Sequence, residues 1–450
     1  MREWMQEEPV VIASGEGALL RDTCGNEYID ANSSIWTNLH GHRHPKITRA
    51  IKEQLDRIAH SSFLGLSNVP AIELAEKLVS IAPRSSSRTL SRVFYSDDGS
   101  TAMEAAIKMA FQHWRHKKQP RRRKFVAFAG SYHGDTLGAV SVGGIDLFHA
   151  TFKPLLFETV RVNEIAPLKR IFARQGREIA AVCIEPLAQG AAGMRLWRRG
   201  LLAELRELCD RHETLLIADE VLTGFGRTGT MFACEQEKVV PDLMALAKGL
   251  TGGYLPLAAT LATEEIFNVF LGDYSEFKTF FHGHSYTGNQ LGCAAALANL
   301  CIFEEEHTLQ NLKSQISNLK SGLESCRTLP HVGEIRHIGM IGAVELFADA
   351  GRKKPFPLHQ KMGFKVCDEM RKRGVLTRAI GNTTVMMPPY CVTDAQMGKI
   401  FHALRESIRI VCGKTTARGR SKFIWRATLR RGRPAKRETR RSASLQEPFK

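Results

Sequence analysis

The sequence lacks any uninterrupted apolar run close to the ~20 residues that a helix needs to cross a bilayer. Its first residues, MREWMQEEPVV, carry acidic side chains where a signal peptide would carry an apolar stretch. Membrane insertion and export are therefore not expected, and we expect a cytoplasmic location. Hydrophobic residues make up 43% and charged residues 24% of the sequence, a composition typical of globular proteins. The length of 450 residues predicts two or three domains.

The sequence also lacks cysteines at the spacings typical of redox or zinc sites. The ten cysteines include no CxxC pair and no Cys/His cluster at the spacing of a zinc site. In a long chain without an export signal, scattered cysteines are typical of free thiols, most of them buried. We expect neither a disulfide framework nor a bound metal.

Acidic residues are scarce in one region only, and this explains most of the net charge of +17. Residues 414–450 hold 13 Lys/Arg against two Glu, a net of +11, which leaves +6 for residues 1–413. This segment has little apolar periodicity, so we expect a basic, disordered tail. Binding of nucleic acid through such a tail would be non-specific and salt-dependent, and we do not expect it as a function.

Short runs of β-branched and aromatic residues alternate with helical patterns through the middle of the chain. Helical stretches such as Thr101–Lys117 and Gly200–His212 separate the strands. The expected strands are Arg92–Ser96, Lys124–Phe128, Ala180–Ile184, Leu215–Asp219, Leu243–Ala247 and Leu257–Leu261. This alternation predicts an α/β domain whose mostly parallel sheet is buried on both faces. Ligands of such sheets bind at the carboxyl ends of the strands.

The pattern changes from about residue 303. A polar helix over Glu304–Leu323 precedes strand-like residues Met340–Leu346, a helix near Gln360–Arg373 and a short run Thr384–Pro388. These elements predict a smaller α+β domain that Val10–Ile35 completes. The expected division is residues 1–44 and 303–413 in the smaller domain, 45–302 in the large domain, and 414–450 in the tail.

One segment, SDDGSTA at Ser96–Ala102, lies between a predicted strand and a predicted helix. A Gly-Ser-Thr turn at a helix N-terminus offers free backbone N–H groups, hydroxyls and the positive end of the helix dipole, which together suit a phosphate. Serine and threonine in this place are also common as plain helix caps. Both interpretations stay open for this segment alone.

Two charged residues stand at the ends of apolar strands. Asp219 ends the strand LLIAD, where a carboxylate is costly unless it is paired, either with a protonated pyridine nitrogen or in a salt bridge at the sheet edge. Lys248 follows the strand Leu243–Ala247 and precedes a glycine-rich turn. A desolvated lysine is a nucleophile toward aldehydes, although most lysines at strand ends are simply solvated.

The order of these features is more specific than any one of them. A phosphate turn, an acid and a lysine 29 residues after that acid resemble the arrangement in fold-type I pyridoxal-phosphate enzymes. Six ordered segments over about residues 20–400 are similar to class III (omega) aminotransferases: SDDGSTAMEAAIKMA, SYHGDTLGAVSVGG, IEPLAQGAAGM, ADEVLTGFGRTG, AKGLTGG and HGHSYTGNQLGCAAALA. The resemblance implies a mostly parallel seven-stranded sheet flanked by helices, a smaller α+β domain, and pyridoxal 5'-phosphate as cofactor.

Within class III, three segments resemble the subfamily that converts 8-amino-7-oxononanoate to 7,8-diaminononanoate in biotin biosynthesis, with adenosylmethionine as amino donor. They are SYHGDT with Asp135, where many relatives have arginine; Asn32–Trp36 followed by His40-Gly41-His42; and Arg378 followed by Met387–Tyr390. Lysine as the donor stays an alternative. Another class III activity, on ornithine, 4-aminobutyrate or a similar amine, is the second alternative.

The resemblance also implies a role for each matching residue that holds the cofactor. Lys248 would form the Schiff base and carry protons, Asp219 would pair with the ring nitrogen, and Tyr132 would stack on the ring. Gly99 and Ser100 would bind the phosphate. Ser285 would reach the phosphate in the neighbouring subunit, which implies a homodimer with active sites at the subunit interface.

The same resemblance implies a substrate site. Arg378 would bind the carboxylate of the keto acid by a bidentate contact, and an apolar slot would hold its methylene chain. The residues implied in substrate binding are Trp36, Tyr132, Lys248, Arg378, Arg227 and Gly283.

The sequence departs from this subfamily in three places. Many members have two adjacent tryptophans where this chain has Ile35-Trp36, so one aromatic wall of the slot is lost. Family members begin ten or more residues earlier with an aromatic motif near the cofactor, so we expect a shortened or misassigned start and reduced activity. The basic tail is the third departure.

Overall fold

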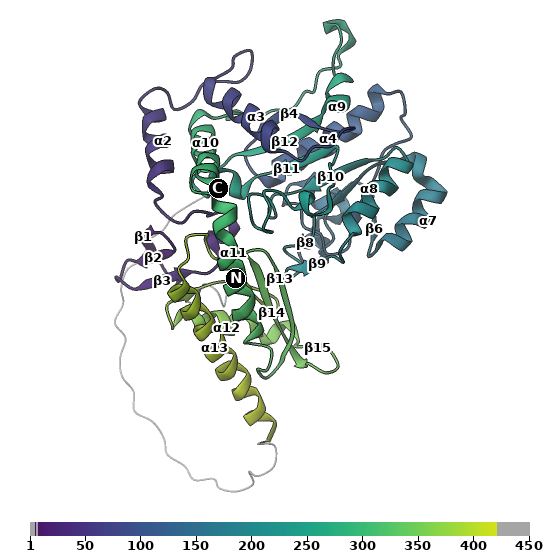
Figure 1. Ribbon diagram of the computed structural model, residues 1–450. Helices are drawn as coiled ribbons and strands as arrows, with labels where there is room; N and C mark the ends of the chain where they lie inside the picture. The colour runs from purple at the N-terminus through teal and green to yellow at the C-terminus, as the bar shows by residue number, and fades with distance from the viewer. Residues whose placement is uncertain (1–4, 6–7, 421–450) are drawn as a thin grey trace, which may run out of the picture.

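The computed structural model describes residue 5 and residues 8–420, with the backbone alone for 414–420. Predictions about the start of the chain and about residues 421–450 lie outside this part. A seven-stranded sheet with helices on both faces forms the upper body of the molecule, and two smaller sheets with three long helices lie below it (Figure 1). Within the described residues, no helix combines the length and apolar composition needed to cross a membrane.

The large sheet confirms the predicted α/β fold. Its strands, in spatial order, are β4 (Leu90–Ser96), β12 (Ala258–Thr263), β11 (Leu243–Leu246), β10 (Leu215–Asp219), β7 (Ile179–Ile184), β5 (Lys124–Phe128) and β6 (Thr159–Val162). Only β12 runs antiparallel to its neighbours, and the other pairs are parallel. The sequence predicted six of the seven strands, and β6 was missed because it is short and contains an arginine.

Alternating side chains along the central strands explain why helices cover both faces. On β10, Leu215 and Ile217 pack with the alanine-rich side of α4 (Gly99–His116). Leu216 and Ala218 pack on the opposite face with α7 (Ile165–Gln175) and α8 (Leu201–Arg211). Full burial of each Leu or Ile side chain stabilises the fold by about 1.5–3 kcal/mol.

The smaller sheets join the two ends of the chain. One contains β1 (Ile12–Glu16), β2 (Leu19–Asp22), β3 (Glu27–Asp30) and β16 (Val375–Leu376). The other contains β13 (Val332–Ile338), β14 (Ile341–Asp349), β15 (Lys354–Pro355), β17 (Ala379–Ile380) and β18 (Thr383–Met386). Because β3 pairs in parallel with β16, the N-terminal strands belong to the same sheet as a C-terminal strand. The domain boundaries themselves stay predictions.

The helices that surround these sheets include one corrected prediction. They are α2 (Pro45–Leu55), α3 (Val69–Ile81), α10 (Gln290–Glu305), α11 (Thr308–Glu324), α12 (Met362–Arg371) and α13 (Asp394–Arg420). The single helix predicted over Glu304–Leu323 is wrong at its start, because His307 takes a left-handed conformation (φ 48°) that ends one helix before the next begins. Helix α13 also continues seven residues into the segment predicted as a tail.

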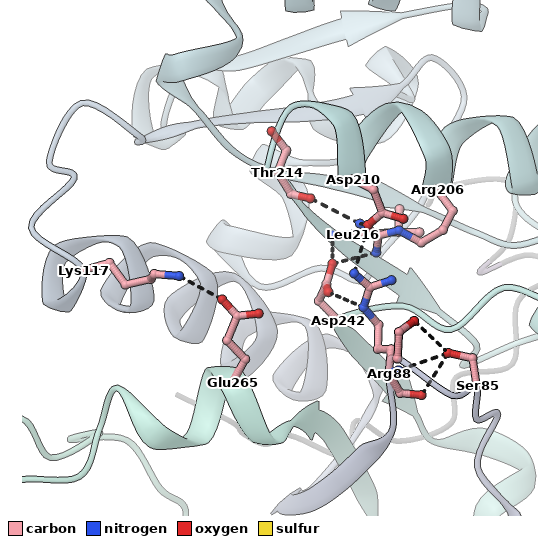
Figure 2. Close-up of polar contacts among 10 residues, drawn as sticks. Ser85, Arg88, Lys117, Arg206, Asp210, Thr214, Leu216, Asp242 and Glu265 are labelled. Atoms are coloured by element: carbon pink, nitrogen blue, oxygen red, sulfur yellow. Dashed lines mark hydrogen bonds and ion pairs between the residues drawn. The ribbon is translucent and has the colours of Figure 1, made fainter.

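A buried ion-pair network fastens the amino ends of the large sheet (Figure 2). Asp242, directly before β11, accepts the guanidinium of Arg206 from α8 at 2.7 Å and that of Arg88 at 3.0 Å. The same carboxylate accepts the backbone N–H of Leu216 on β10 at 2.7 Å. The network therefore joins β10, β11, α8 and the segment before β4 at the amino ends of the strands, on the side of the sheet away from their carboxyl ends.

Candidate active site

A cavity of about 1250 Å³ lies at the carboxyl ends of the parallel strands. One wall consists of residues that follow these strands: Asp97–Ser100 after β4, Tyr132–Asp135 after β5, Glu185 after β7, Asp219 at the end of β10 and Lys248 after β11. Parallel strands bring their carboxyl ends to one edge of a sheet, and this explains why residues so far apart in sequence meet there. The expected location of the site is thus the observed one.

Lys248 lies on the wall of this cavity in a strained backbone conformation. Its φ of 41° is in the left-handed region, which non-glycine residues adopt at an energetic cost and mostly at functional sites. Loss of hydration lowers the pKa of the Lys248 amine, Arg378 lowers it further, and the carboxylates of Asp219 and Glu185 oppose the shift. The net lowering increases the fraction of neutral, nucleophilic amine at neutral pH.

Asp219 is held by a histidine that the sequence interpretation missed. The Nδ1 atom of His133 lies 2.7 Å from Oδ2 of Asp219, and the backbone N–H of Val221 donates to Oδ1 at 3.0 Å. Burial lowers the pKa of His133, but its hydrogen bond to Asp219 and the charge of that carboxylate outweigh burial, so the net shift is upward. His133 therefore orients the Asp219 carboxylate at the cavity wall.

The start of α4 forms an anion cradle. Asp98 and Thr101 cap the helix mutually, because the Asp98 carboxylate accepts the N–H of Thr101 at 3.0 Å and the Thr101 hydroxyl accepts the N–H of Asp98 at 2.9 Å. The cap leaves Gly99 and Ser100 on the cavity wall. A Cβ atom on Gly99 would lie 2.7 Å from Val221, so only glycine allows this approach. Helix N-termini of this kind bind phosphate.

Tyr132 is fixed at both ends. Its hydroxyl donates to Oδ2 of Asp135 at 2.8 Å, and its backbone N–H donates to Oε1 of Glu185 at 3.0 Å. Burial and the hydrogen bond to Asp135 raise the pKa of the phenol, which keeps the hydroxyl protonated. The ring therefore stays neutral and stationary beside the cavity.

Glu185 is a second cavity residue that the sequence interpretation missed. It comes directly after β7, and Asp219 is the last residue of the neighbouring strand β10. It accepts the backbone N–H groups of Tyr132 and Gly190 at 3.0 and 2.8 Å. Burial raises its pKa to about 7. The signal that could have found it is the same as for Asp219, an acidic residue after a fully apolar strand.

The opposite wall comes from helices and connections next to the smaller sheets and carries apolar side chains around one cation. It includes Ile35, Trp36, Leu358, Phe364 and Arg378. The Trp36 ring centroid lies 5.2 Å from Nζ of Lys248 and 5.9 Å from Cζ of Arg378, within the range of cation–π attraction. Ile35, which stands where the resemblance implies a second tryptophan, also lines the cavity and is 52% exposed.

The turn that carries these two residues is left-handed. Ser33, Ser34, Ile35 and Trp36, assigned to α1 (Ser33–Trp36), have φ values of 46°, 47°, 67° and 70°. Each L-residue in this conformation costs roughly 1–2 kcal/mol, and runs of four without glycine are very rare. The surrounding structure must therefore hold this turn firmly.

Three predicted site residues do not reach the cavity of their own chain. Arg227 is buried and donates to the carbonyl oxygens of Pro388 and Asn38 at 3.0 and 3.2 Å, so its guanidinium joins two chain segments behind the cavity. Ser285 and Gly283 lie on an exposed loop, where the Ser285 carbonyl accepts from His60. The structure brings the other predicted residues together.

Comparison with known proteins agrees with this geometry. Residues 1–408 match the class III aminotransferase family. The chain is 49% identical to the adenosylmethionine-8-amino-7-oxononanoate aminotransferase of Nitratidesulfovibrio vulgaris, over 94% of this chain and 81% of that protein, and 48% identical to that of Geobacter sulfurreducens, over 92% and 95%. The crystal structure of the same-named enzyme from Methanocaldococcus jannaschii superposes with a TM-score of 0.89 at 43% identity, covering 91% of this chain and 95% of that one. An omega transaminase from Pseudomonas jessenii in complex with PMP gives a TM-score of 0.87 at 30% identity, covering 92% and 95%. The fold predicted for a transaminase is thereby confirmed, and the chain belongs to the class III aminotransferase family.

Proposed function

We propose that this enzyme transfers an amino group from adenosylmethionine to 8-amino-7-oxononanoate, giving 7,8-diaminononanoate for biotin biosynthesis. The observation that carries the proposal is that the Trp36 ring lies within cation–π range of both a reactive amine, Lys248, and a guanidinium, Arg378, on the wall of one cavity. A keto acid whose carboxylate is separated from its reacting carbon by a methylene chain needs this combination of an anion anchor, an apolar wall and a nucleophilic centre. Relatives at 48–49% identity carry the name of this activity.

The residues fit pyridoxal phosphate, the cofactor of class III aminotransferases. The N–H groups of Gly99 and Ser100 at the start of α4 would hold its phosphate, and Asp219 would pair with its ring nitrogen. Lys248 would anchor it covalently, and Tyr132 would lie against its ring. When bound, the cofactor accepts an amino group from the donor and withdraws electrons from the reacting carbon.

The side chains of this chain then have separate tasks. Nζ of Lys248, with its lowered pKa, takes a proton from the donor's carbon and returns one to the acceptor's. His133 holds the Asp219 carboxylate in place through the bond from its Nδ1 atom, so that this carboxylate would be available to pair with the cofactor's ring nitrogen. Arg378 binds the acceptor's carboxylate, and Trp36, Ile35 and Tyr132 exclude water from its methylene chain.

We also propose a homodimer whose sites are shared. Ser285 and Gly283 are exposed and lie outside their own cavity, so they serve the partner's site if they serve any. Large apolar side chains on the same stretch of chain are exposed to an unusual degree, Phe281 by 72% and Tyr286 by 63%. A second copy of the chain would cover them. Mixing Lys248→Ala and Ser285→Arg chains should restore activity, since a mixed dimer contains one intact site; mixtures as inactive as the separate variants would contradict shared sites.

A spectral assay tests the activity. The amino form of the purified holoenzyme is mixed with 8-amino-7-oxononanoate, and we expect return of the aldehyde-form absorbance together with 7,8-diaminononanoate, detected by mass spectrometry. Adenosylmethionine and lysine are compared side by side as donors that regenerate the amino form. If 2-oxoglutarate or pyruvate reacts and the keto acid does not, the chain has another class III activity.

A further inference from the structure

The left-handed turn at Ser33–Trp36 is held by one buried carboxylate. Asp30, 2% exposed, accepts the backbone N–H of Asn32 at 3.1 Å and both the N–H and the hydroxyl of Ser34, at 2.9 and 3.0 Å. The Ser33 hydroxyl donates to the carbonyl of Met387 at 2.6 Å. These bonds fix the backbone of the turn, but none of them fixes the direction of the indole ring.

Asn32 supplies that missing constraint. The indole N–H of Trp36 donates to Oδ1 of Asn32 at 3.0 Å, and the backbone N–H of Trp36 donates to the Asn32 carbonyl at 2.9 Å. Both side chains are buried, with 8% and 7% exposure. Met194, Leu222 and Val385 belong to the same buried apolar cluster as Trp36, and their side chains offer no hydrogen bond to the ring.

The direction of the ring matters because both cations of the cavity lie against it. A rotation of the indole would change its distances to Nζ of Lys248 and to the guanidinium of Arg378 together.

We propose that Asn32 is a positioning residue for the acceptor substrate, which acts by fixing the Trp36 indole between the reactive lysine and the carboxylate-binding arginine. Asn32 does not line the cavity, so it acts through Trp36 alone. The inference rests on the proposed function for the identity of the acceptor, and it adds the residue that orients the aromatic wall of the acceptor site.

A double-mutant cycle on the holoenzyme tests this inference. Asn32→Leu keeps the shape of the side chain and removes the acceptor, and Trp36→Phe keeps an aromatic wall and removes the N–H. In the wild-type background we expect Asn32→Leu to raise the KM for the keto acid, and the Kd for nonanoate measured by calorimetry, about fivefold, with kcat little changed. In the Trp36→Phe background it should have no further effect. Asn32→Ala serves the same cycle if the leucine variant does not fold.

The matched control is Asn26→Leu, which removes another asparagine side-chain hydrogen bond, to Asp22, on an exposed turn of the same sheet. It should leave KM and Kd unchanged. An equal loss from Asn32→Leu in both Trp36 backgrounds would overturn the inference. A wild-type enzyme that does not aminate the keto acid would contradict the proposed function instead, and the cycle on nonanoate binding would still decide the role of Asn32.

Discussion

Replacing Arg378 by alanine tests the substrate wall of the cavity most directly. The guanidinium lies 5.9 Å from the Trp36 ring, in the connection between β16 and β17. A hydrogen bond to a charged group contributes about 1.5–3 kcal/mol, so the loss of a bidentate carboxylate contact should cost about 3–5 kcal/mol. Because each 1.4 kcal/mol is a factor of ten, kcat/KM for the keto acid should fall by a factor of about 100 to 4,000. Arg378→Lys, which keeps the charge without the planar fork, should lose less.

The assay compares two acceptors in the half-reaction of the amino-form enzyme. One is 8-amino-7-oxononanoate, and the other is its analogue with a methyl group in place of the carboxylate. Arg378→Ala should slow the first reaction and leave the second almost unchanged. An equal loss with both acceptors would refute the assignment, since Arg378 would then act on the fold or on the cofactor.

The same variant makes a prediction about pH. Burial is the main cause that lowers the pKa of Lys248, and the charge of Arg378 lowers it further. Without this charge the pKa of Lys248 should rise, because its protonated form is no longer repelled. The rising limb of the pH–rate profile measured with the methyl analogue should therefore move to higher pH, and a limb that stays in place or moves down would contradict the electrostatic argument.

Three further predictions concern single side chains. Lys248→Ala should abolish turnover and the absorbance band of covalently bound cofactor, and a retained band would contradict its role. Asp242→Ala removes the carboxylate that pairs with Arg206 and Arg88 and accepts the N–H of Leu216, while Arg206 keeps its second partner, Asp210; the free energy of unfolding in urea should fall by about 3 kcal/mol. Glu265→Ala, at the exposed pair with Lys117 in Figure 2, should cost less than about 1 kcal/mol, and equal losses from the two variants would refute the importance of the network. For Glu185, a folded-state pKa of about 7 means that the native chain binds an extra proton between about pH 4.5 and 7, so stability falls as pH rises through this window, by about 3 kcal/mol in total. Urea titrations at pH 5 and pH 8 measure this difference, and Glu185→Gln should make the free energy of unfolding nearly equal at the two pH values. A variant that loses as much stability between pH 5 and 8 as the wild type would argue against the raised pKa of Glu185.

The residues on the sheet side of the cavity could be predicted from the sequence, because each stands at the end of a recognisable apolar strand. Asp219 and Lys248 follow fully apolar strands, and parallel strands end at one edge, so the sequence alone places both at one site. His133 gave no such signal. It lies in a loop after β5, and only the folded chain shows that its ring reaches the carboxylate of Asp219.

The other side of the cavity depends on features that local sequence does not encode. Nothing in the letters SSIW indicates a left-handed turn, since the stretch contains no glycine and its conformation is imposed by Asp30 and by Met387. The burial of Arg227 likewise follows from tertiary contacts with Asn38 and Pro388. Motif resemblance predicted substrate binding by this arginine and could not show that its buried side chain contacts Asn38 and Pro388 and does not line the cavity.

The parallel pairing of β3 with β16 has a consequence for how the molecule acquires its activity. Residues Leu90–Thr263, which supply the sheet side of the cavity, are synthesised together and contain their own packed strands and helices. Trp36, in contrast, is made early, and its segment is joined to residues more than 340 positions later, by the pairing of Ile29 with Val375 and by the bond from Ser33 to Met387. Contacts between residues so far apart in sequence form late in folding, because the entropy of closing the long loop is lost before the contacts stabilise the chain. During refolding we therefore expect an intermediate that binds the cofactor before it can bind the keto acid.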